Sequence, residues 1–164
     1  MSADGASSNQ HANLIQHPMD FPGDRFTVLA TWPEFQNKAP EDVPPFVANY
    51  YEQGLENLAA RRWDAAGAMF RKALDVATKQ LRPDLASNKL YNRIEAMVEG
   101  QDLTPAMGQW SHRIRLDGND AIHEEVPETE EDAAASQQFC EAFLTYAYTL
   151  PALVAQGQSK AEPT

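Results

Sequence analysis

Hydrophobic and polar residues follow one another along most of the chain with the period of an α-helix. Between residues 63 and 81, apolar side chains recur at steps of three and four, so they share one helix face. These positions are Trp63, Ala66, Phe70, Ala73, Leu74, Ala77 and Leu81. Alanine is commoner than isoleucine and valine together, which favours helix over strand because β-branched side chains lose rotamer freedom in a helix.

The same spacing predicts five helices. They cover residues 45–60, 63–81 and 87–99, a fourth that begins at Pro105 and carries Met107, Trp110 and Ile114, and a fifth that begins after Thr129 and fades at Gly157. Thr129 and Asp132 have the spacing of a capping box at the start of the fifth helix, and Pro151 is expected to kink or shorten it. Five helices joined by short loops predict an all-α fold, a bundle of about five helices with a Pro-rich N-terminal arm.

The N-terminal region lacks this periodicity. Residues 1–20 are small and polar, so we expect a disordered tail, and residues 21–44 are rich in proline, so we expect an extended arm. The bundle is then expected over residues 45–157, followed by a second disordered tail at 158–164.

Charge narrows the range of functions. The chain has 13 Lys and Arg residues and 24 Asp and Glu residues, so its net charge is −11. This charge argues against a protein that binds bulk DNA or an anionic membrane by electrostatic attraction. Residues 61–115 are nevertheless locally basic, with ten basic and six acidic residues. Either an ordinary ion-paired surface or a basic patch beside an acidic wall fits this distribution.

Generic catalytic motifs are missing from the sequence. It has one cysteine, Cys140, which excludes a disulfide framework and a Cys-cluster zinc site within one chain. It has no Gly-rich phosphate loop, no Gly-x-Ser-x-Gly elbow and no His-Glu-x-x-His pair, and we expect neither cofactor nor metal. Because no apolar run approaches the length of a membrane span and no signal peptide is visible, we expect a cytoplasmic protein without membrane contact.

One short stretch gathers residues suited to acid–base and phosphate chemistry. If residues 112–123 form one helix, Arg115, Asn119 and His123 are spaced i, i+4 and i+8 and share a face. The Asp-Gly-Asn sequence that ends at Asn119 is also a turn signal. A break there would put His123 on the next segment, still close to Arg115, and both interpretations stay open.

Four pieces of sequence together resemble a bacterial family without an assigned function, which occurs alone and at the ends of restriction and other defence proteins. The pieces are Arg71-Lys72-Ala73-Leu74-Asp75, Leu90 with Arg93-Ile94, the run from Arg115 to His123, and the acidic segment from Glu128 to Ala133. The resemblance covers about residues 45–155. That family is similar to the HEPN superfamily of helical bundles, many of which are metal-independent RNases that work as dimers.

The resemblance assigns roles to individual residues. His123 would act as the acid–base group, since an unperturbed histidine titrates near pH ~6.5, Arg115 would hold the phosphate, and Asn119 would be the polar residue between them. The superfamily signature separates Arg from His by four to six residues. Here seven residues separate Arg115 from His123, and Gly118 stands where the arginine is expected. This departure favours a non-enzymatic interaction or scaffold role in a nucleic-acid or phage-defence setting.

Three alternatives stay open. The first is a metal-independent endoribonuclease that uses His123 and Arg115. The second is a structural polar network in which the same stretch contacts Asp75 and Arg71. The third is an adaptor that binds a peptide, because Tyr50, Gly54, Ala66, Phe70 and Ala73 resemble one unit of a tetratricopeptide repeat, although such arrays need about three units.

We also name candidate binding residues and partners. The candidate binding residues are Arg113, Arg71, Arg93 and Asp75. We expect a homodimer and a protein partner, whereas the net charge does not favour RNA as a ligand.

Overall fold

The computed structural model describes residues 37–114 and 126–161, and the statements below refer to these residues. The chain divides into two units, Met1–Phe35 and Gln36–Thr164, and the described residues lie in the second. Every regular element within them is helical, which confirms the predicted all-α fold. None of their helices is long and apolar enough to cross a membrane.

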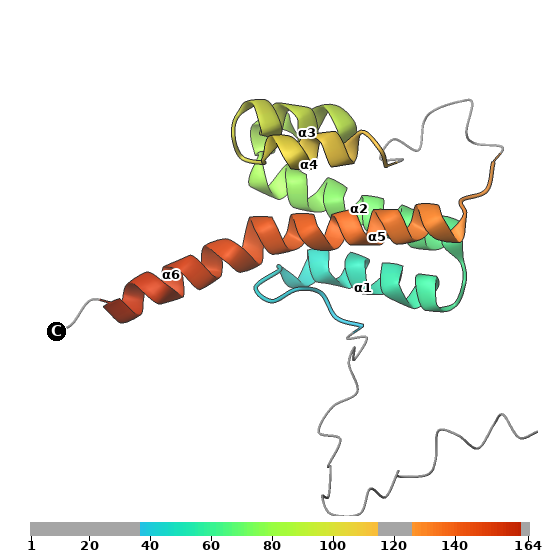
Figure 1. Cartoon of the computed structure of the whole chain (residues 1–164), viewed down its shortest axis with the longest axis horizontal. Helices are drawn as coiled ribbons and strands as arrows, with labels where there is room; N and C mark the ends of the chain where they lie inside the picture. The colour runs from blue at the N-terminus through green and yellow to red at the C-terminus, as the bar shows by residue number, and fades with distance from the viewer. Residues whose placement is uncertain (1–36, 115–125, 162–164) are drawn as a thin grey trace, which may run out of the picture. The chain divides into compact units, whose positions relative to one another are not determined.

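The described elements follow the predicted order. They are α1 (Pro45–Ala59), α2 (Trp63–Leu81), a 3-10 turn η1 (Pro83–Leu85), α3 (Leu90–Glu99), α4 (Pro105–Ser111), α5 (Glu130–Leu144), a π-helical turn η2 (Thr145–Thr149) and α6 (Leu150–Ala161). Because α5, η2 and α6 run on without a break, they form one long helix, and the described helices make up the expected five (Figure 1).

Helix α2 is the centre of the bundle. It packs against α1 on one side and α5 on another, and its C-terminal part contacts α3 (Figure 1). Most side chains of its predicted apolar face are buried, namely Ala66, Phe70, Ala73, Leu74 and Ala77. Aromatic rings link α2 to its neighbours: the Phe70 ring lies 5.6 Å from that of Tyr51. The predicted apolar face of this helix is therefore confirmed.

The contact between α1 and α2 is close because it includes a glycine. A Cβ atom on Gly54 would lie 2.6 Å from Cδ1 of Phe70, a distance that real Cβ contacts do not reach. The absence of a side chain at Gly54 thus lets the Phe70 ring occupy the space between the helices. The helical hairpin that the tetratricopeptide resemblance implied is present, and the role as an adaptor that binds a peptide stays a prediction.

Two helix ends differ from the prediction. Helix α3 begins at Leu90 and not at residue 87, because the carbonyl oxygens of Ala86 and Asn88 accept hydrogen bonds from the side chain of Arg93. Helix α4 ends at Ser111, so Ile114 is buried in the turn that follows the helix.

The start of α5 confirms the predicted capping box. The Thr129 hydroxyl accepts a hydrogen bond from the backbone N–H of Asp132, and the Asp132 carboxylate accepts one from the backbone N–H of Thr129. Both groups satisfy donors that a helix start leaves without helical partners.

Pro151 does not end the last helix. The helix continues to Ala161, beyond the expected end at Gly157, and the turn before Pro151 widens into η2. In this turn the backbone N–H of Leu150 donates to the carbonyl of Thr145, five residues earlier. A proline clashes with the carbonyl four residues before it in a regular α-helix, and a wider π turn accommodates that clash.

Candidate functional site

Helix α2 carries a polar stripe beside its apolar face. Its members are Asp64, Gly67, Arg71, Asp75 and Thr78, at steps of three and four, so they lie along one side of the helix. One end of this polar stripe faces residues 126–129, and the other end faces Arg93 of α3.

At the first end, the stripe holds Glu128. The Asp64 carboxylate accepts a hydrogen bond of 2.8 Å from the backbone N–H of Glu128, and Arg71 forms an ion pair with the Glu128 carboxylate. A Cβ atom on Gly67 would lie 2.6 Å from Cδ of Glu128, so the glycine makes room for this carboxylate. The Glu128 side chain is 9% exposed, and its second oxygen, Oε2, is buried without a hydrogen-bond partner.

At the other end, Arg93 ties α3 to α2. Its side chain is fully buried, at 0% exposure. Its Nε donates to the Thr78 hydroxyl at 2.8 Å, and its Nη2 donates to the Asp75 carboxylate at 2.5 Å. Its Nη1 donates to the carbonyl of Asn88 at 2.6 Å. Such a set of bonds compensates the cost of burying a guanidinium group.

Asp75 stays ionised at neutral pH. Its partial burial alone would raise its pKa, but hydrogen bonds from Lys79 and Arg93 outweigh this effect and lower the pKa from the usual 3.8. The Lys79 and Lys72 ammonium groups lie 2.9 Å and 3.9 Å from the Asp75 carboxylate, so this carboxylate balances the buried Arg93 and two exposed cations.

A second polar group lies where α3 meets the end of α4. The Tyr91 hydroxyl donates to Glu95 at 3.0 Å and contacts Nδ1 of His112. The Nε2 atom of His112 lies 3.7 Å from the Glu95 carboxylate, so Tyr91, Glu95 and His112 form one partly exposed polar group.

The structure brings together part of the predicted site. Arg93 and Asp75 form an ion pair, and Arg71 lies one helical turn from Asp75 on the polar stripe, paired with Glu128. Arg113 is exposed, in the turn that follows α4. The three residues predicted for catalysis lie outside the described residues: they are Arg115, Asn119 and His123.

The sequence pattern did not single out three members of the polar stripe. They are Asp64, Gly67 and Thr78, and their spacing from Arg71 and Asp75 was the available signal. The spacing alone does not show which side chains contact that side of α2, because Glu128 and Arg93 come from other parts of the chain.

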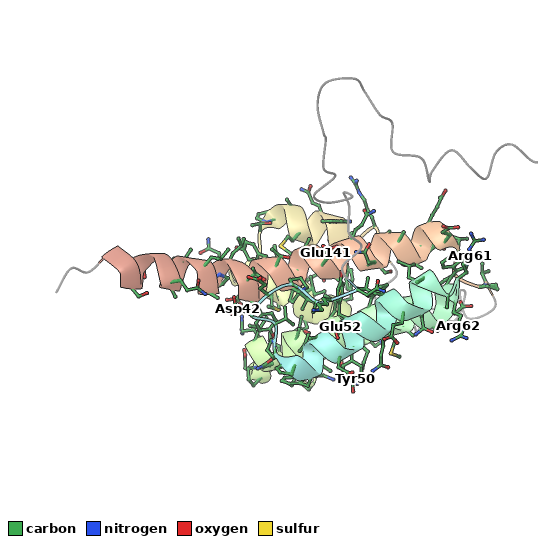
Figure 2. The ribbon with its side chains drawn as sticks, turned by 90° about the horizontal axis from the view of Figure 1, so that it is seen from below. Asp42, Tyr50, Glu52, Arg61, Arg62 and Glu141 are labelled. Carbon is green, nitrogen blue, oxygen red and sulfur yellow. The ribbon has the colours of Figure 1, made fainter. Side chains whose placement is uncertain are left out.

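Five of the nine basic side chains that the structure describes in the locally basic middle of the chain form ion pairs. Each lies within 4.0 Å of a carboxylate, and they are those of Arg71, Lys72, Lys79, Arg82 and Arg93. Arg61 and Arg62 are exposed at the turn between α1 and α2 (Figure 2). The described part of this region therefore favours an ordinary ion-paired surface over an open basic patch.

Cys140 lies in the core and is fully buried. Burial raises the pKa of its thiol, which opposes formation of the nucleophilic thiolate. Within residues 37–114 and 126–161, no group of three or more metal-ligating side chains comes together.

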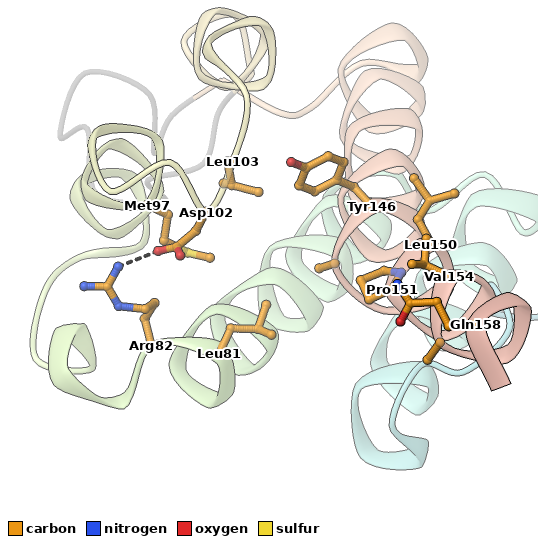
Figure 3. A pocket seen from close by; sticks show the side chains of 12 residues that line it. Leu81, Arg82, Met97, Asp102, Leu103, Tyr146, Leu150, Pro151, Val154 and Gln158 are labelled. Atoms are coloured by element: carbon orange, nitrogen blue, oxygen red, sulfur yellow. Dashed lines mark hydrogen bonds and ion pairs between the residues drawn. The ribbon is translucent and has the colours of Figure 1, made fainter. Parts of the chain in front are cut away.

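A groove of about 630 Å³ lies between the last helix and the region where α2, α3 and the loop after α3 meet (Figure 3). We call it the α6 groove. The side chains that line it are Leu81, Arg82, Met97, Asp102, Leu103, Tyr146, Ala147, Leu150, Pro151, Val154, Ala155 and Gln158. Its lining is mostly apolar, and its charged pair, Arg82 and Asp102, is joined by an ion pair of 2.5 Å.

Residues 150–159 of α6 carry no charge and expose three large aliphatic side chains. Leu150, Leu153 and Val154 are 46%, 50% and 59% exposed. Residues 142–159 contain no charged residue, although 23% of the whole chain is charged. Among the described elements, α6 packs mainly on η2, so the described residues leave much of this surface uncovered.

The helical architecture of the described residues defines the class of this protein, an all-α domain. Residues 55–160 match the family described as a domain of unknown function, DUF4145, and the chain belongs to that family. No curated protein and no solved structure matches the chain.

Proposed function

We propose that this chain is a non-enzymatic, HEPN-like interaction protein that forms a homodimer and acts as a scaffold in the cytoplasm. The observation that carries this proposal is the surface of residues 150–159 of α6, which has no charge and where three large aliphatic side chains lie about half exposed. Contiguous apolar surface on a soluble domain marks a site where another molecule binds.

The polar residues of the described bundle support a structural role. Arg93 and Asp75 tie α3 to α2, and Arg71 ties α2 to Glu128. Each of these side chains uses its charge on a partner within the chain. These ion pairs within the chain stabilise the helical bundle. The apolar side chains of α6 are then the feature that is exposed to a partner.

The HEPN-like character and the nucleic-acid or phage-defence setting rest on the sequence resemblance. An all-α bundle is compatible with it. Under this proposal Arg115, Asn119 and His123 support folding or partner binding, because Gly118 replaces the arginine that the nuclease signature requires.

Incubation with RNA tests the non-enzymatic part of the proposal. The purified chain and its His123→Ala variant are each mixed with a heterogeneous RNA pool in a chelating buffer. We expect no cleavage by either protein. Cleavage by the wild type that disappears in the variant would establish the endoribonuclease alternative and overturn the proposal.

Capture of partners from the native host tests the interaction part. Val154→Glu places a charge on the exposed surface of α6, whereas Gln156→Glu adds the same charge about 200° around the helix. We expect the wild type and Gln156→Glu to retain the same partners and Val154→Glu to lose them. Equal retention by all three proteins would show that α6 is not the interaction surface.

A further inference from the structure

The exposed surface of α6 has the spacing of a helix–helix interface. Ala147, Leu150, Val154 and Gly157 follow one another at steps of three, four and three, which places them along one line of the continuous helix. We call this line the α6 seam. Three of its members line the α6 groove, so the seam and the groove form one continuous surface (Figure 3).

No contact within the described part of the chain explains Gly157. A glycine inside a helix is destabilising by roughly 0.5–1 kcal/mol relative to alanine. A Cβ atom at this position would meet nothing within 4 Å, so no neighbouring group among residues 37–114 and 126–161 requires a glycine here. A missing side chain at an exposed position in line with Leu150 and Val154 is the feature that allows a second helix to approach closely.

We propose that the α6 seam binds the α6 seam of a second copy of this chain, with the two helices antiparallel. This inference rests on the proposed interaction role and names its partner surface. In an antiparallel pair centred between Leu153 and Val154, Leu150 of each copy lies opposite Gly157 of the other. The leucine side chain of each helix then fills the space beside the glycine of the other helix. This contact occurs twice, as a two-fold symmetric interface requires.

Charge identifies a second copy as the partner that this surface suits. Two copies of a chain with a net charge of −11 repel each other across most of their surfaces. Residues 142–159 have no charge, so contact there brings no like charges together. A basic partner would bind an acidic surface of this protein more favourably than the uncharged surface of α6.

The α6 groove extends the same interface. In the antiparallel arrangement, the C-terminal half of the second α6 runs back toward η2 of the first copy. There Tyr146 and Leu103 lie on opposite sides of the groove (Figure 3). Two short helices bury less than the roughly 1,600 Å² of a standard interface, so we expect a dimer that dissociates in the micromolar range.

Sedimentation of the full chain over a concentration series tests this inference. The wild type and Gln156→Glu are expected to dimerise with the same dissociation constant, since Gln156 lies away from the seam. Val154→Glu and Gly157→Leu are each expected to weaken the dimer by at least about tenfold. Circular dichroism verifies that every variant remains helical.

Gly157→Leu separates association from local structure. Leucine is a better helix former than glycine, so a purely local effect would raise helicity and leave association unchanged. Loss of the dimer together with equal or higher helicity therefore supports the seam. A dimer insensitive to both seam variants would overturn the inference and leave the homodimer of the proposed function intact. A wild type that stays monomeric throughout would overturn both the seam and the homodimer, while the capture experiment would still decide whether α6 binds another protein.

Discussion

Arg93 shows how a single polar residue can organise a helical core. It is the largest side chain that the described bundle buries completely, and its bonds reach Asp75 and Thr78 on α2 and the carbonyl of Asn88 before α3. The same bonds that satisfy its charge delay the start of α3. A residue that resembled a binding group in sequence thus fixes the position of one helix against another.

We predict that Arg93→Ala destabilises the protein by about 3 kcal/mol, because it removes buried contacts and leaves the Thr78 hydroxyl and the Asp75 carboxylate without this donor. Chemical denaturation at neutral pH measures the effect. Arg82→Ala is the matched control, since it breaks two ion pairs at the surface, with Asp84 and Asp102, and should change stability much less. Equal losses in both variants would contradict the role assigned to Arg93.

Asp75 provides a pH-dependent test of the same contact. Its pKa is lower in the folded protein than its usual 3.8, so its stabilising effect is present above that value and is lost as the pH falls through the lower, folded pKa. Asp75→Asn keeps the shape without the charge. The difference in unfolding free energy between wild type and Asp75→Asn should be large at neutral pH and should shrink as the pH falls below 3.8. A difference that stays constant with pH would contradict the assigned ion pair.

Gly54 and Phe70 form a second residue-scale contact that can be tested. Gly54→Ala forces a Cβ atom against the Phe70 ring and should cost about 1–3 kcal/mol. In a Phe70→Leu background the ring is gone, so the added cost of Gly54→Ala should fall well below its cost alone. A double-mutant cycle from denaturation measurements gives this coupling, and strictly additive effects would contradict the close packing of α1 on α2.

The apolar residues of α2 could be predicted from the sequence, while the partners of its polar residues could not. Phe70 and Ala73 follow from spacing alone, because a helix has a fixed period and burial follows hydrophobicity. Pairing of Arg93 with Asp75 depends on how α3 packs on α2. That arrangement is set by contacts between segments, which a pattern within one segment does not contain.

At the scale of elements, α5 begins with a local signal that is strong enough to predict. Thr129 and Asp132 form the expected capping box. Thr129→Ala should destabilise the protein by about 1 kcal/mol, since a backbone N–H loses its acceptor, and Thr129→Ser should restore most of the loss. Thermal or chemical unfolding measures both. If the serine variant were as unstable as the alanine variant, a role for the hydroxyl would be contradicted.

The turn between α5 and α6 was not predictable to the same degree. Pro151 signalled an irregularity, but the chain accommodates it with a π turn and continues as a helix to Ala161. A kink, an end or a widened turn all resolve the same clash. Which one occurs depends on how Tyr146 and its neighbours pack on the bundle, and that information is absent from the local sequence.

At the scale of the whole molecule, charge and hydrophobicity are divided between regions. The middle of the chain balances its basic residues with carboxylates, and residues 142–159 are free of charge. The sequence resemblance implied catalytic roles for Arg115, Asn119 and His123, which lie outside the described residues. Exposure of Leu150 and Val154 became visible only with the fold, because an amphipathic pattern does not say whether its apolar face is covered.

Hydrogen exchange at two protein concentrations tests the central claim most directly, that this protein works through the exposed surface of α6. Association should slow exchange of the amides of residues 150–161 at the higher concentration and leave α2, which is buried in each copy, unchanged. Val154→Glu should abolish this concentration dependence. Exchange in α6 that is the same at both concentrations in the wild type, with protection rising in another region, would contradict the claim.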